Sequence, residues 1–90
     1  MTFDEWADGI ALRVTAAVPE VYLKRKIDDV CRWIHAGKEC QLHAVSDSQA
    51  AFVVLRRDGV FTDSPFSCHI AIAAGSEDEV ARRIIGWFGK

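Results

Sequence analysis

The apolar positions of the first eighteen residues predict an amphipathic helix that begins at Thr2. Thr2 and Glu5 have the spacing of a capping box, in which the hydroxyl and the carboxylate each accept a hydrogen bond from a free backbone N–H. Pro19 ends this helix, because the residue before a proline avoids the helical conformation. The apolar residues that share one helical face are Phe3, Trp6, Ala7, Ile10, Val14, Ala17 and Val18.

The pattern of the next segment predicts a second helix over residues 20–36. Several oppositely charged residues stand four apart here, such as Glu20 and Lys24, as on the outer face of a helix. Gly37 is then expected to form a left-handed cap at the C-terminal end. Tyr22 and Trp33 lie on a flanking stripe. The buried stripe of this predicted helix is Leu23, Ile27, Val30, Cys31 and Ile34.

The period then changes to two, which predicts strands. Residues 39–45 alternate, and residues 50–55 are apolar on both faces, which is typical of a central strand covered on both sides. Asp58-Gly59 indicates a tight hairpin turn. A third strand is expected from Val60, interrupted at residues 63–65 by Asp-Ser-Pro and resumed over residues 66–72.

A last helix is expected after Gly75, with Ser76 and Glu79 in capping-box spacing. Its apolar stripe is Val80, Ala81, Ile84, Ile85 and Phe88. The chain is therefore predicted to be a single α+β domain over residues 1–90. Its elements are two N-terminal helices, a three-stranded antiparallel sheet and a C-terminal helix.

Composition narrows the class of protein. The 90 residues are 50% hydrophobic and 27% charged, so we expect a folded chain. The formal net charge of −2 gives no overall cationic field for nucleic acid or anionic lipid. The acidic N-terminus lacks the basic start of a secretory signal, and three cysteines without such a signal indicate reduced thiols. We expect a cytoplasmic protein without a membrane segment.

The histidines and cysteines invite a test for zinc. Cys31, His35, Cys40 and His43 lie within thirteen residues and are ligand types that zinc uses. Cys40 and His43, however, stand three apart on a predicted strand and so point to opposite faces. We therefore expect no metal.

Catalytic sets fare no better. The chain has no G-x-S-x-G and no C-x-x-C motif. A triad of Cys68 with a histidine and an aspartate could be proposed only because these residue types are present, whereas a triad is recognised by its geometry. We expect no enzyme activity and no cofactor. A nucleic-acid surface would need the basic clusters at residues 24–26, 56–57 and 82–83 on one face with aromatic residues between them, and we do not expect it.

One family resemblance follows from the predicted order of elements. The strands at 42–45, 51–55 and 66–73, then Ala74-Gly75-Ser76 and a helix, resemble the first half of the GNAT acetyltransferase fold, and in particular the short GNAT-like proteins of bacteriophages. Membership would imply acetyl-CoA binding through a Gln/Arg-x-x-Gly-x-Gly/Ala loop. This chain supplies only Gly75 of that loop and no following strand, so the resemblance implies a truncated relative without cofactor or catalytic residues.

Three functions are therefore open. The first is a non-catalytic protein-binding or inhibitory module encoded by a phage or mobile element, such as an inhibitor of host defence of the anti-CRISPR type. The second is a phage structural or accessory protein that acts as an oligomer, and the third is a degenerate GNAT-like acyl-CoA-dependent transferase. The expected partner is another protein chain, either a host protein or a second copy. The candidate interface residues are Tyr22, Trp33, Trp87, Gln41, His43 and His69.

Overall fold

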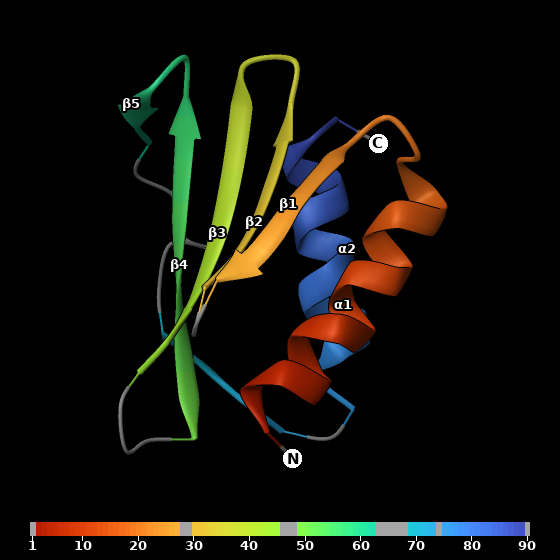
Figure 1. Cartoon of the computed structure of the whole chain (residues 1–90), viewed down its shortest axis with the longest axis vertical. Helices are drawn as coiled ribbons and strands as arrows, with labels where there is room; N and C mark the ends of the chain where they lie inside the picture. The colour runs from red at the N-terminus through yellow and green to blue at the C-terminus, as the bar shows by residue number, and fades with distance from the viewer. Residues whose placement is uncertain (1, 28–29, 46–48, 63–68, 74, 90) are drawn as a thin grey trace.

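The computed structural model describes residues 2–27, 30–45, 49–62, 69–73 and 75–89. It has two layers, an antiparallel sheet and a pair of helices that both pack on one face of the sheet (Figure 1). The strands follow the order β1-β2-β3-β4-β5, and β6 also pairs with β4. The elements are α1 (Phe3–Ala17), β1 (Tyr22–Ile27), β2 (Val30–His35), β3 (Lys38–Ala44), β4 (Ala50–Arg57), β5 (Val60–Phe61), β6 (His69–Ala71) and α2 (Glu77–Trp87).

Helix α1 confirms the expectation for the N-terminus. Thr2 is the N-cap, its hydroxyl accepts from the Glu5 backbone N–H at 3.1 Å, and the Glu5 carboxylate accepts from the Thr2 backbone N–H at 3.2 Å. The helix ends at Ala17, two residues before Pro19. Trp6, Ile10 and Val14 are buried on its inner face.

The predicted second helix is wrong, because residues 20–36 form strands β1 and β2. Strand β2 has partners on both sides, β1 and β3, and its Cys31 and Trp33 are buried with period two. β-branched and aromatic residues favour such a pleated, packed surface, and this tertiary pairing outweighs the four-residue charge spacing.

The turn that joins β2 to β3 explains part of that error. Ala36 and Gly37 both have positive φ, 49° and 79°, as the two central residues of a tight hairpin turn require. Asp58 and Gly59 have the same signature at 53° and 80°, which confirms the second hairpin. The two turns touch: the Asp58 N–H donates to the Gly37 carbonyl at 2.7 Å. A Cβ at Gly37 would meet Asp58 Oδ1 at 2.5 Å.

The antiparallel pairing expected from the sequence is present, but the sheet has more strands than the three that were predicted. Strand β3 pairs with β4 from Lys38↔Arg57 to Ala44↔Ala51. The third predicted strand is divided into β5 and β6, which both pair with β4. The predicted interruption at residues 63–65 lies outside the described residues.

Helix α2 forms as expected, but the predicted capping box at its start is wrong. Ser76 has helical φ and ψ, and its hydroxyl makes no cap hydrogen bond. That hydroxyl instead donates to the Ala73 carbonyl at 2.7 Å and accepts from Trp6 Nε1 at 2.8 Å. The serine thus ties the start of α2 to α1, which Arg13 and Asp78 also join at 3.9 Å.

The core lies between the helix pair and the sheet. The alternation of β2 directs Trp33 into this core, where it is fully buried, so it is a packing residue and cannot act as the surface anchor that the sequence suggested. Within the described residues, the Trp33 indole N–H has no hydrogen-bond partner. The core residues contributed by the strands are Cys31, Trp33, Cys40, Leu42, Ala51, Val53 and Leu55.

Candidate functional site

The second face of the sheet carries the candidate site, which we call the helix-free face because α1 and α2 both lie on the other side (Figure 1). Strand register assigns its residues, since neighbours of a core residue along a strand point away from the core. Three cross-strand rows result: Ile34, Glu39, Arg56 and Phe61; Arg32, Gln41 and Val54; and Val30, His43 and Phe52. Residues 50–55 were expected to be covered on both sides, and this is wrong. The helices cover only one side of β4, and Phe52 and Val54 on the other side are half-buried.

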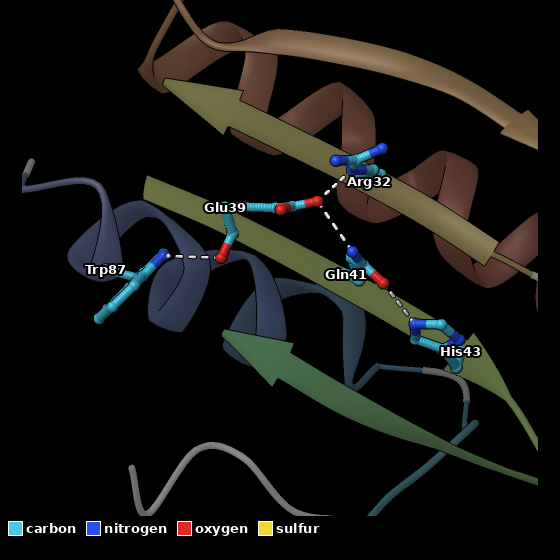
Figure 2. A network of polar contacts seen from close by, with 5 residues as sticks. All are labelled: Arg32, Glu39, Gln41, His43 and Trp87. Carbon is cyan, nitrogen blue, oxygen red and sulfur yellow. Dashed lines mark hydrogen bonds and ion pairs between the residues drawn. The ribbon is translucent and has the colours of Figure 1, made fainter. Parts of the chain in front are cut away.

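A chain of polar contacts crosses this face along β2 and β3 (Figure 2). The Arg32 guanidinium forms an ion pair with Glu39 Oε2, and Gln41 Nε2 donates to the same oxygen at 2.8 Å. Gln41 Oε1 lies 2.6 Å from His43 Nε2. The alternation of strand β3 places Glu39, Gln41 and His43 on one side of it, so the network is built into the local sequence.

The electrostatics of the network fix its charge state. Glu39 is only 8% exposed, and this burial acts to raise the pKa of its carboxyl group. The hydrogen bonds from Arg32 and Gln41, with the charges of Arg32 and Arg56, outweigh burial and hold the pKa below its ordinary value. Glu39 is therefore a carboxylate at neutral pH.

His43 has the opposite tendency. Burial, and then the positive charge of Arg56, lower the pKa of its imidazole. The ring stacks on Phe52 with centroids 4.8 Å apart and planes 12° apart. A neutral imidazole in this position can donate from Nε2 to Gln41 Oε1 and present an aromatic face with Phe52.

Apolar side chains surround the network. Ile34, Phe52 and Val54 are half-buried, and Phe61 at the edge is 60% exposed. Arg56 is exposed next to Phe61 in register, and its guanidinium makes no hydrogen bond or ion pair within the part of the chain that the structure describes. Aromatic residues and arginine are the residue types that dominate binding energy at protein interfaces.

Trp87 lies elsewhere, at the C-terminal end of α2. Its Nε1 donates to the Glu39 carbonyl at 3.3 Å, while Lys38 Nζ and the Arg57 guanidinium lie 5.5 and 5.7 Å from its ring. Lys38 also donates to the Trp87 carbonyl at 3.0 Å, which complements the negative end of the helix dipole. Trp87 is half-buried and these contacts join α2 to the end of the sheet, while its place in an interface stays a prediction.

Of the other predicted interface residues, Gln41 and His43 lie on the helix-free face, and the backbones of Tyr22 and His69 lie beside it. Gln41 and His43 belong to the polar network. Tyr22 is paired in register with Ile34, and His69 with Phe52, which places both backbones beside the rows of this face.

Of the ten residues in the three rows, the sequence analysis named only Gln41 and His43 as candidates; the residues it missed include Arg32, Glu39, Arg56 and Phe61. For Glu39, a signal was present, because polar residues at every second position of an otherwise apolar strand indicate a network on one face.

Groups that could carry metal or nucleophilic chemistry are not assembled among the described residues. No three of their His, Cys, Asp and Glu side chains are grouped as metal ligands. Cys40 is in the core while His43 is on the helix-free face, as the strand spacing predicted. Burial raises the pKa of the Cys40 thiol, so it is a poor nucleophile. The position of Cys68 is outside the described residues.

One further hollow lies outside the helix-free face. It lies on α1, has a volume of about 370 Å³, and is lined by Asp8, Ala11, Leu12 and Thr15. Leu12 is 75% exposed at its surface.

Comparison with known proteins identifies no family for this chain. The GNAT-like resemblance was based on a predicted order of elements with two helices before the strands. The structure has one helix there, and GNAT-like identity stays a prediction. Neither α1 nor α2 combines the length and the apolar character that a membrane-crossing helix needs. No protein-family model, curated protein or solved structure matches the chain.

Proposed function

We propose that this chain is a non-catalytic protein-binding module and that the helix-free face is its binding surface. The observation that carries the proposal is the difference between the two faces of the same strand. One face of β4 is packed against helices, whereas Phe52, Val54 and exposed Arg56 on the other face have no helix above them. Half-buried apolar groups beside an exposed arginine are characteristic of the centre of protein interfaces.

The state of the polar groups supports binding rather than catalysis. The Glu39 carboxylate already accepts from Arg32 and Gln41, and its lowered pKa makes it a weak base. The Gln41 side chain is hydrogen-bonded to Glu39 and to His43, which lie on the same side of β3. Because the polar groups of this network are hydrogen-bonded to one another, burying them under a partner would carry only a small free-energy penalty.

Two partners fit this proposal. The first is a host protein, which would make the chain an inhibitory module of a phage or mobile element, of the kind that blocks host defence. The second is another copy of the chain, which would make it an accessory protein that works as an oligomer. The degenerate transferase is the weaker proposal, because Glu77, Asp78 and Glu79 in the first turn of α2 oppose an anionic cofactor there.

A matched pair of substitutions on β5 tests the binding surface. Phe61 and Val60 are adjacent and both largely exposed, at 60% and 68%, but Phe61 pairs with Arg56 on the helix-free face and Val60 pairs with Arg57. Immobilised wild-type protein, Phe61→Ser and Val60→Ser are compared for proteins retained from lysate and for self-association.

We expect Phe61→Ser to lose binding by about tenfold or more and Val60→Ser to keep it, with all three proteins melting alike. Equal binding by Phe61→Ser and wild type, or equal loss in both variants, would contradict the proposal.

A further inference from the structure

The helix-free face carries one charge that no described residue balances. The charged side chains in its three rows are Arg32, Glu39 and Arg56. Arg32 and Glu39 form an ion pair with each other. The Arg56 side chain is exposed, and no hydrogen bond or ion pair joins its guanidinium to another described residue. Burial, and then the charge of Arg56, lower the pKa of the His43 imidazole, so this ring adds no second cation at neutral pH.

The unbalanced charge lies beside an exposed aromatic ring. Arg56 is paired in register with Phe61, which is 60% exposed at the edge of the sheet. Any partner that covers Phe61 therefore also removes water from the Arg56 guanidinium. A charge that loses its hydration without gaining an opposite charge is strongly unfavourable. A partner of this face must therefore bring an acidic group to Arg56.

The same face of a second copy offers no such group. A two-fold contact presents the same patch on both subunits. The only acid in the three rows is Glu39, which is 8% exposed and already accepts from Arg32 and Gln41. Pairing the face with itself would add a second unbalanced Arg56 and no acid for the first. The charge of the face thus disfavours a two-fold dimer through it.

A phosphate backbone is a poor match for a single cation. Proteins that bind nucleic acid set several Lys and Arg side chains against successive phosphates. The three rows supply one free guanidinium, and the Glu39 carboxylate belongs to the residue paired with Arg56 in register. The neighbouring Phe52, Val54 and Phe61 side chains are apolar. One carboxylate among apolar groups, as on a protein surface, matches this pattern better than a polyanion.

We propose that the partner of the helix-free face is a different protein, which presents a carboxylate to Arg56 and an apolar side chain to Phe61. This inference rests on the proposed function, since it names the chemistry of the partner for the same face. The partner needs no further charge over β2 and β3, because Arg32, Glu39 and Gln41 are paired with one another. Added salt should weaken the contact, because its ion pair lies at an exposed site.

Selection of peptides against adjacent charge variants tests the proposal. A phage library of random short peptides is selected on immobilised wild-type protein, Arg56→Glu and Arg57→Glu. We expect wild type to select peptides with an Asp or Glu beside an apolar residue, and Arg56→Glu to select Lys or Arg in its place. Arg57→Glu changes the net charge by the same amount, but Arg57 lies at Trp87 on the other face, so this control should select acidic peptides like wild type.

One selected peptide then measures the ion pair directly. It is synthesised with its acid and with the matching amide, and calorimetry compares the two on wild type and on Arg56→Gln. We expect the amide to bind wild type about tenfold more weakly, and the two peptides to bind Arg56→Gln nearly alike. Circular dichroism melting checks that each variant is folded, and Arg56→Gln keeps the test usable if Arg56→Glu does not fold.

The possible failures separate this inference from the proposed function. Peptides that lose binding in Phe61→Ser but contain no acid would overturn the carboxylate and leave the helix-free face as the binding surface. Self-association that Phe61→Ser abolishes, or binding of an oligothymidylate that Arg56→Glu abolishes, would overturn the different protein as partner. No enriched peptides, or peptides that bind Phe61→Ser as well as wild type, would contradict the proposed function itself.

Discussion

The two faces of the sheet share the same strands but differ in almost every physical property. Val53 and Val54 are consecutive in β4, yet Val53 is 3% exposed under the helices and Val54 is half-buried on the helix-free face. The covered face is apolar and holds the core. The helix-free face combines an ion pair, an amide and a histidine with apolar neighbours. Because side chains alternate along a strand, one short sequence encodes a packed core and an accessible surface of mixed polar and apolar groups.

The polar groups of the two faces differ in a second way. On the helix-free face, Arg32, Glu39, Gln41 and His43 are bonded to one another. On the covered face, the Trp33 indole N–H has no partner among the described residues, whereas the Trp6 indole donates to Ser76. Among the described residues, the core therefore tolerates one unsatisfied indole donor, while the Arg32–Glu39–Gln41–His43 network of the helix-free face is paired within itself.

The largest expected effect is on the covered face. Trp33→Ala should lower the free energy of unfolding by about 3–5 kcal/mol, because it leaves a large cavity in the core. Gln41→Ala, on the helix-free face, should cost about 1 kcal/mol or less. Urea unfolding followed by circular dichroism measures both.

If Trp33→Ala does not fold, Trp33→Phe keeps the comparison usable. The phenyl ring retains most of the packing and removes the unsatisfied N–H, so its cost should fall well below that of Trp33→Ala. Equal costs for Trp33→Ala and Gln41→Ala would show that the two faces contribute alike to stability.

A middle-sized effect separates the two adjacent valines. Val53→Thr buries a hydroxyl group in the core and should cost about 1–3 kcal/mol. Val54→Thr keeps a β-branched side chain on an accessible face and should stay within about 0.5 kcal/mol of wild type. Thermal and urea unfolding of the two variants give the difference, and a larger cost for Val54→Thr would reverse our assignment of the faces.

The smallest expected effect is the pH dependence that comes from Glu39. Its pKa is lower in the folded than in the unfolded chain, so the unfolded chain binds more protons at acid pH. The stability that Glu39 contributes is present above the unfolded pKa and is lost as the pH falls through the folded pKa. Because Arg32 is partly exposed, we expect about 1 kcal/mol.

Urea unfolding at a series of acid pH values tests this dependence. Glu39→Gln should flatten the acid side of the stability profile. Glu79→Gln, which removes only an exposed pair with Arg83, is the control and should leave the slope nearly as in wild type. An unchanged slope in Glu39→Gln would mean that the network does not hold the carboxylate.

The sequence predicted α1, α2, the alternation of β3 and the Asp58-Gly59 turn, since each depends on local spacing. It failed over residues 20–36, where charges four apart imitate a helix and the pairing of β2 with both neighbours decides the structure. The Ala36-Gly37 turn was missed because alanine rarely adopts positive φ. Gln41 and His43 could be assigned to the candidate site from strand period alone. Arg32 and Arg56 could not, because their place depends on register between strands.

The methyl groups of Val53 and Val54 offer the most direct test of the claim that the helix-free face binds protein. Methyl NMR spectra would be recorded as the protein is concentrated and as any retained partner is added. We predict that the Val54 methyl signals shift or broaden while those of Val53, one residue away in the same strand, stay in place. Binding that perturbs Val53 and leaves Val54 unchanged, or that leaves both unchanged, would contradict the account.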